Sequence, residues 1–260
     1  MPLPEPTPGS RIASGITGIL QERARQARVA EVRIGLGYTA VRLEDRRTGV
    51  AYTFRQEAQG GCSVFHGLRP LSGRLAAELL PLLESIDPIE SAVGLACANA
   101  LANHHGAAYQ HGDILEQLDL GPEDRVAMVG NFGPLIAPLQ QRACSLTVFE
   151  KVKQPQGYLR PAEEAIDHLP RCQVALITGT SIINHTIDGL LDAARDCRVV
   201  AVVGASTPML PEVFSSTVVS LLSGVVVEQP SEIMKVVSEG GGMRQFKGYI
   251  RKVNLAVGRT

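Results

Sequence analysis

Four apolar, β-branched runs in the second half of this 260-residue chain each end in a group of small polar residues. Buried parallel strands read as continuous hydrophobic runs because helices cover both faces of their sheet. Ligands bind such sheets just beyond the carboxyl ends of the strands, so we expect the polar groups to line one crevice. The runs and the groups that follow them are Val126–Val129 before Gly130–Pro134, Leu146–Phe149 before Glu150-Lys151, Val174–Ile177 before Thr178–Ser181, and Val199–Val203 before Gly204–Pro208.

Helix signals lie between these runs. Pro134 and Pro161 suit the first turn of a helix, and Asn184 suits the cap of a third one. The alternation ends with a strand over 218–227, a helix over 231–238 and a last strand over 249–257. Because parallel β-α-β connections are right-handed, the sequence predicts an α/β fold with a doubly wound, Rossmann-like parallel sheet over residues 122–260.

Residues 10–121 follow a different pattern and predict a smaller α+β domain. Gly35 and Gly37 fall inside the first predicted strand and indicate a bulge or a close backbone approach. Residues 1–9 are rich in proline and predict a flexible arm. The predicted elements are a helix over 10–29, strands over 32–43 and 50–55, and helices over 75–83 and 88–101.

Composition narrows the class of protein. The chain has 25 Lys and Arg against 26 Asp and Glu, which gives no strong field toward nucleic acid or an anionic membrane. No apolar stretch reaches the roughly 20 residues that a membrane span needs. The five cysteines are widely spaced without a Cys-x-x-Cys pair, which favours reduced thiols in a cytoplasmic protein. Cys172 and Cys197 immediately precede predicted strands, so we expect them at the amino edge of the sheet, opposite the crevice.

The segment Gly130–Pro134 stands where a dinucleotide-binding fold keeps its phosphate loop. Glu150 ends the next strand about 20 residues later, where such folds place a ribose-binding acid. The glycine pattern differs from the usual one, however, and Pro134 lacks an amide donor that a pyrophosphate would use. A generic tight turn explains the glycines as well, so nucleotide binding remains an alternative.

The densest polar segment is Thr178–Thr186. Hydroxyls and amides at a helix start suit an anion, because free N–H groups and the helix dipole both point there. Ordinary capping by Ser181 and Asn184 explains the same residues without a ligand. His185 is a candidate acid–base group or metal ligand, and Glu150 on a facing strand end would make it one of a pair.

Two other groups carry weaker signals. Ser206 lacks the second glycine of a nucleophile elbow, because Pro208 stands in its place, so we do not expect covalent catalysis. His104, His105, His111 and Asp113 lie close together in the sequence, and such imidazoles can capture zinc, nickel or copper. Their spacing matches no standard ligand pattern, which favours a solvated loop.

The C-terminal half resembles the heavy-metal chelation domain, a Rossmann-like family of unassigned activity, and the N-terminal half resembles its companion domain, which is similar to the N-terminal domain of enolase. This resemblance implies two domains that meet over a shared cleft with a role in metal chelation. It does not imply enolase activity, because the chemistry of that enzyme resides in a barrel that this chain lacks. The matching segments are Val129–Phe132, Phe149–Lys151, Thr178–Thr186, Gly204–Pro208, Ser223–Val225 and, in the companion domain, Gly94–Ala100.

The main hypothesis is therefore a cleft protein that binds a metal, a metal complex or a small anionic ligand. Glu150 and His185 are its expected metal-contacting pair, for a divalent transition metal whose identity the sequence leaves open. One alternative is an enzyme that uses NAD or S-adenosylmethionine in the same crevice, and another is a non-catalytic partner in a metal-cofactor pathway. Neither nucleic acid nor a membrane is an expected partner, and the sequence leaves open whether the chain forms a homo-oligomer. The expected ligand-binding residues are Asn131, Glu150, Thr178, Thr180, Ser181, Asn184, His185, Ser206, Thr207, Asn99 and Tyr38.

Overall fold

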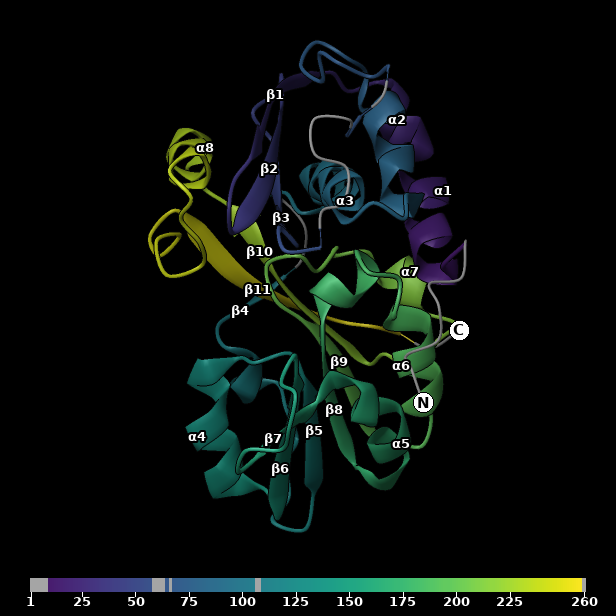
Figure 1. Ribbon diagram of the computed structural model, residues 1–260, viewed down its shortest axis with the longest axis vertical. Helices are drawn as coiled ribbons and strands as arrows, with labels where there is room; N and C mark the ends of the chain where they lie inside the picture. The colour runs from purple at the N-terminus through teal and green to yellow at the C-terminus, as the bar shows by residue number, and fades with distance from the viewer. Residues whose placement is uncertain (1–8, 58–63, 66, 106–108, 259–260) are drawn as a thin grey trace.

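The computed structural model describes residues 9–57, 64–65, 67–105 and 109–258. Residues 1–8 of the predicted arm lie outside this range, and so does Cys62. The molecule has an N-terminal part of helices around a small sheet, and a C-terminal part built on a large twisted sheet (Figure 1). No helix within the described ranges is long and apolar enough to cross a membrane.

The N-terminal part packs helices on a three-stranded antiparallel sheet of order β1-β2-β3. Helix α3 is buried along almost its whole length because its residues are mostly small. A Cβ atom at Gly49 in β3 would lie 2.2 Å from the Ala96 carbonyl oxygen, so only glycine lets α3 approach this strand so closely. The elements are α1 (Arg11–Arg25), β1 (Val29–Ile34), β2 (Tyr38–Leu43), β3 (Thr48–Tyr52), α2 (Ala76–Leu79), η2 (Leu80–Glu84) and α3 (Pro88–Ala102).

The strand predicted over 32–43 is in fact two strands. Gly35 donates its N–H to the Tyr38 carbonyl at 2.9 Å and closes a tight turn between β1 and β2. A Cβ atom at Gly35 would lie 2.2 Å from the Val237 carbonyl oxygen of helix α8. The predicted close backbone approach is therefore present, but it marks a turn and not a bulge within one strand.

The C-terminal part is a Rossmann-like α/β fold on an eight-stranded sheet of order β4-β11-β10-β9-β8-β5-β6-β7. Strands β5 to β10 run parallel to their neighbours, whereas β11 pairs antiparallel with β10, and β4 pairs antiparallel with β11. The strands are β4 (Gln110–His111), β5 (Arg125–Val129), β6 (Ser145–Glu150), β7 (Leu159–Pro161), β8 (Val174–Thr178), β9 (Val199–Val203), β10 (Leu221–Val227) and β11 (Ile250–Ala256).

Helices and helical turns connect these strands. The helix predicted to start at Pro161 is instead broken into three short pieces, because Pro170 interrupts it and β7 takes its first residues. Helices α4, α6 and α8 begin within a few residues of their predicted starts. The helices and helical turns of this part are η3 (Ile114–Glu116), α4 (Gly133–Arg142), η4 (Ala162–Glu164), α5 (Ala165–His168), η5 (Leu169–Arg171), η6 (Gly179–Ile182), α6 (Ile187–Ala193), α7 (Pro211–Phe214) and α8 (Pro230–Ser238).

One hydrophobic core runs through both parts. It joins Leu20 and Leu95 of the N-terminal part to Ile177 and Val200 of the large sheet, all fully buried. Helix α8, near the end of the chain, lies against β1 and β2 of the small sheet (Figure 1). The two parts therefore hold a fixed relation across the carboxyl edge of the large sheet.

Candidate functional site

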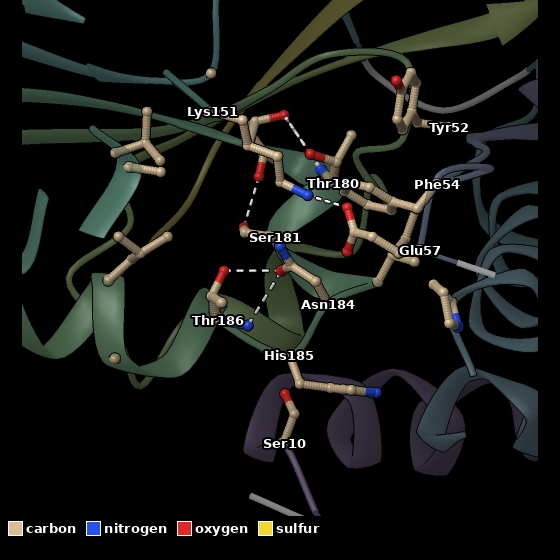
Figure 2. Close-up of a pocket in the computed structure, with 18 of the residues that line it drawn as sticks. Ser10, Tyr52, Phe54, Glu57, Lys151, Thr180, Ser181, Asn184, His185 and Thr186 are labelled. Atoms are coloured by element: carbon tan, nitrogen blue, oxygen red, sulfur yellow. Dashed lines mark hydrogen bonds and ion pairs between the residues drawn. The ribbon is translucent and has the colours of Figure 1, made fainter. Parts of the chain in front are cut away.

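A cleft of about 1670 Å³ opens between the two parts at the carboxyl ends of β5, β6 and β8 (Figure 2). Strand order reverses here, because β6 lies on one side of β5 and β8 on the other, so the loops that follow them diverge. Gly130 lets the backbone after β5 lie close to Thr178 at the end of β8. Its φ is +95°, and a Cβ atom there would lie 2.9 Å from the Cβ of Thr178. The cleft therefore occupies the position where doubly wound sheets bind their ligands.

Glu150 at the end of β6 is held in one orientation by two backbone donors. Its Oε2 accepts the Asn131 N–H at 3.1 Å, and its Oε1 accepts the Lys151 N–H at 2.8 Å. A carboxylate offers about four lone-pair sites, so both oxygens can still accept from, or coordinate, a ligand. The bond from Asn131 also uses an amide that a phosphate loop would offer to a pyrophosphate.

The segment after β8 satisfies most of its own polar groups. Ser181 donates its hydroxyl to the Thr178 carbonyl at 2.6 Å, and the hydroxyls of Thr178 and Thr180 lie 3.0 Å apart. Asn184 accepts at its Oδ1 from the Thr186 hydroxyl at 2.8 Å (Figure 2). The predicted caps are therefore wrong: Thr178 caps η6 by accepting the Thr180 N–H, and α6 begins after Thr186 without a side-chain cap. The bonds to Thr186 orient the Asn184 amide, which lines the cleft.

His185 connects the two parts. Its Nε2 lies 2.9 Å from the Ser85 carbonyl, which can only accept, so Nε2 carries a proton. In the neutral ring Nδ1 then has the lone pair, and it is buried with no hydrogen-bond partner in the described part of the chain. The backbone holds this ring with a φ of 56°, a left-handed conformation that non-glycine residues rarely adopt.

Lys151 is a cleft residue that the sequence reasoning did not select. Its ammonium forms an ion pair with Glu57 of the N-terminal part and lies 4.9 Å from the centre of the Phe54 ring. Tyr52 packs edge-on against Phe54, so an aromatic wall faces the strand ends (Figure 2). The one sequence signal for Lys151 as a cleft residue is its position directly after Glu150. Its partners, Glu57 and Phe54, are about 95 residues away in sequence.

The structure brings Asn131, Glu150, Thr178, Thr180, Ser181, Asn184 and His185 to this cleft. The other four expected ligand residues lie elsewhere. Asn99 is buried and donates to the Val50 carbonyl, and Ser206 is buried and accepts the Tyr52 N–H at 2.9 Å. Thr207 is fully buried, and Tyr38 packs against Phe246 and Tyr52, where burial raises the pKa of its hydroxyl. Ser206 and Tyr38 both contact Tyr52, which lines the cleft.

The donor set does not form a protein-only site for a bare metal ion. In the residues that the structure describes, no group of three or more His, Cys, Asp or Glu side chains converges as a set of ligands. Outside the cleft, His105 instead contacts the Arg251 guanidinium, and Asp113 pairs with Lys252. Within the cleft, the Glu150 carboxylate is a suitable donor, whereas the His185 Nδ1 is buried, so a transition metal there needs further ligands from another molecule.

Fold and cleft together define a Rossmann-like α/β protein with a ligand cleft at the switch point of its sheet. Two family models match the chain, one over residues 113–256 and one over residues 18–102, and each is described as "Putative heavy-metal chelation". The chain belongs to this family, whose two models are named DUF364 and DUF4213.

Similar proteins match this chain over nearly their whole length, one in sequence and two in structure. An uncharacterised protein of Methanocaldococcus jannaschii is 25% identical over 249 residues, which cover 92% of this chain and 94% of that protein. A DUF364 protein of unknown function from Pyrococcus horikoshii superposes with a TM-score of 0.81 at 22% identity, over 95% of this chain and 100% of its own. Another from Desulfitobacterium hafniense gives 0.77 at 21% identity, over 94% and 98%.

Proposed function

We propose that the cleft binds a metal in complex with a small anionic organic molecule. The family description supports a role with metals. The size of the cleft argues against a bare ion as its whole ligand: about 1670 Å³ exceeds the roughly 300–1,000 Å³ of ordinary small-molecule pockets. An organic chelator would fill this space and also supply the ligands that the protein lacks.

The observation that carries the proposal is the fixed carboxylate of Glu150. Two backbone N–H groups orient it at the carboxyl end of β6, and no lysine or arginine neutralises it in the described ranges. Glu150 would contact the metal of the bound complex. Lys151 and the Asn184 amide would bind the anionic groups of the chelator, and the Phe54 ring would cover its apolar face.

The direct test is calorimetry on protein without a histidine tag. The probes are Ni²⁺ alone, citrate alone, histidine alone, and the Ni²⁺ complexes of citrate and of histidine. At least one complex should bind with 1:1 stoichiometry and at least tenfold more tightly than either of its components. The result that overturns the proposal is no binding of any complex, or binding of free Ni²⁺ as tight as that of its complexes.

The site assignment is tested with Glu150→Gln, which keeps the shape of the side chain and removes its charge. Binding of the complex should weaken at least tenfold. Glu163→Gln is the matched control, because Glu163 is exposed and lies outside the cleft. Equal affinities for the two variants would contradict the role of Glu150.

One observation favours a second candidate function. Glu150 ends the strand that follows the Gly130 loop, which is the position of a ribose-binding acid in dinucleotide folds. The engaged Asn131 amide and Pro134 leave few donors for phosphates, so we rank this candidate second. A thermal-shift measurement with millimolar NAD and S-adenosylmethionine separates the two, because a ligand that binds only the native state raises the unfolding midpoint.

A further inference from the structure

Two cysteines face each other at the edge of the large sheet that is opposite the cleft. Cys172 and Cys197 stand two residues before Val174 and Val199, which are register partners in the parallel pair β8–β9. Paired residues on adjacent strands are about 4.8 Å apart across the sheet and point to the same face. The topology therefore places the two thiols side by side.

The sulfur contacts confirm this placement. Cys172 donates its S–H to the His168 carbonyl at 3.6 Å, and Cys197 donates to the next carbonyl, Leu169, at 3.5 Å. Both cysteines are free and buried, with 3% and 5% of their surfaces exposed. The carbonyls belong to the turn where α5 passes into η5, and α5 contacts α6 and β5.

We propose that Cys172 and Cys197 form a two-thiolate site for a soft monovalent cation, Cu(I). Thiolates select Cu(I) over the harder ions, and a linear two-coordinate ion needs only these two ligands. On binding, each S–H bond breaks, each sulfur forms a bond to the cation, and two protons pass to solvent without any electron transfer. The product carries one negative charge, and the Arg125 guanidinium acts on Cys172 from the same edge of the sheet.

Proton release makes this site sensitive to pH. Burial raises the pKa of Cys197 to about 12, and burial also raises the pKa of Cys172, where Arg125 acts in the opposite direction. Both groups are therefore protonated thiols near neutral pH until an ion displaces their protons. Because two protons leave for each cation bound, affinity should rise about 100-fold per pH unit below the thiol pKa values.

The two cysteines lie close to the surface along the chain. The residues that precede them, Arg171 and Asp196, are exposed. Strand β8 has five residues, which separate its two ends by about 16 Å at roughly 3.3 Å per residue. The dithiol site is thus independent of the cleft, and this inference does not rest on the proposed function.

The experiment transfers Cu(I) from bathocuproine disulfonate to reduced protein under anaerobic conditions. The starting variant carries Cys62→Ala and Cys144→Ala, which remove the two cysteines that are outside the described residues or exposed. It should bind one Cu(I) per chain. Adding Cys172→Ser should weaken binding at least 100-fold, because one of two ligands is lost, whereas adding Cys97→Ala in buried α3 should leave it unchanged.

Unchanged affinity after Cys172→Ser, or loss after Cys97→Ala in a folded variant, overturns the proposal. Circular dichroism checks that each variant folds. X-ray absorption on the Cu(I)-loaded starting variant keeps the test independent of the serine variant: two sulfur neighbours support the site, and nitrogen or oxygen neighbours overturn it. Calorimetry with the Ni²⁺ complexes then reports on the cleft separately, and its outcome should not depend on Cys172.

Discussion

Asn103 offers the most direct test of how the two parts are joined. It follows α3 in the N-terminal part, and its side chain is buried against strand β10 and the loop between β9 and α7. Its Nδ2 donates to the Thr207 carbonyl at 2.9 Å and to the Val225 carbonyl at 3.3 Å, while its Oδ1 accepts the Met209 N–H at 2.8 Å. Three backbone groups of the C-terminal part therefore depend on one amide.

Asn103→Ala leaves those three backbone groups without their partner in a buried place. Each buried polar group left unpaired costs about 1–3 kcal/mol, and water that enters the space recovers part of this cost. We expect the free energy of unfolding to fall by about 3–5 kcal/mol, which is a large share of the roughly 5–15 kcal/mol that stabilises a native protein.

Urea unfolding followed by circular dichroism measures this loss from the shift in midpoint at constant slope. Asn103→Asp should also destabilise, because it keeps the acceptor for Met209 and loses both donated bonds. Asn131→Ala is the control: Asn131 is exposed, so its replacement should change stability by no more than about 0.5 kcal/mol. A loss below about 1 kcal/mol for Asn103→Ala would refute the reasoning.

Three further expectations concern stability. Gly49→Ala should destabilise the protein by more than about 3 kcal/mol, because the new Cβ would meet the backbone of α3 at 2.2 Å. Gly18→Ala on the open face of α1 should instead stabilise it by about 0.5–1 kcal/mol, and the urea midpoints of the two variants should shift in opposite directions. Ser206→Ala should cost about 1–2 kcal/mol because the Tyr52 N–H loses its acceptor, and chemical unfolding that leaves the midpoint unmoved would contradict this. Burial raises the pKa of Cys97 from 9 to about 12, so the native state keeps a proton that the unfolded chain releases, and stability should fall as pH rises above 9. Unfolding at pH 7.5 and 10 should show a smaller drop for Cys97→Ala than for the parent.

The cleft could be located from sequence because it depends on local patterns. Continuous apolar strands and the polar residues that end them are sufficient to place Glu150, Thr180 and Asn184 at one edge of a parallel sheet. The same logic predicted the opposite edge for Cys172 and Cys197, and the structure places both there. In each case the shared direction of the parallel strands determines the edge at which a residue lies.

Predictions from the sequence are wrong or incomplete where contacts between segments far apart in the chain decide what a residue binds. Ser206 and Thr207 follow β9 as the pattern predicts, yet Ser206 binds the backbone of Tyr52, 154 residues away. The ion pair between Glu57 and Lys151 likewise joins two segments that are far apart in the chain. Gly35 was assigned to a strand because nothing local to it reveals that α8 packs over this position. Pairings of this kind are settled by tertiary packing, which a single sequence does not contain.

The position of α8 on the small sheet determines how the molecule responds to cleavage of its backbone. The chain leaves the N-terminal part after α3, builds the large sheet, and then returns through α8 to contact β1 and β2. Cleavage of the backbone between His104 and His105 would therefore release neither half. The two fragments would stay joined by α8 and by the shared core, so the cleft walls would keep their spacing without a covalent connection at that point. A ligand that binds this cleft as proposed would meet walls whose spacing the shared core already holds.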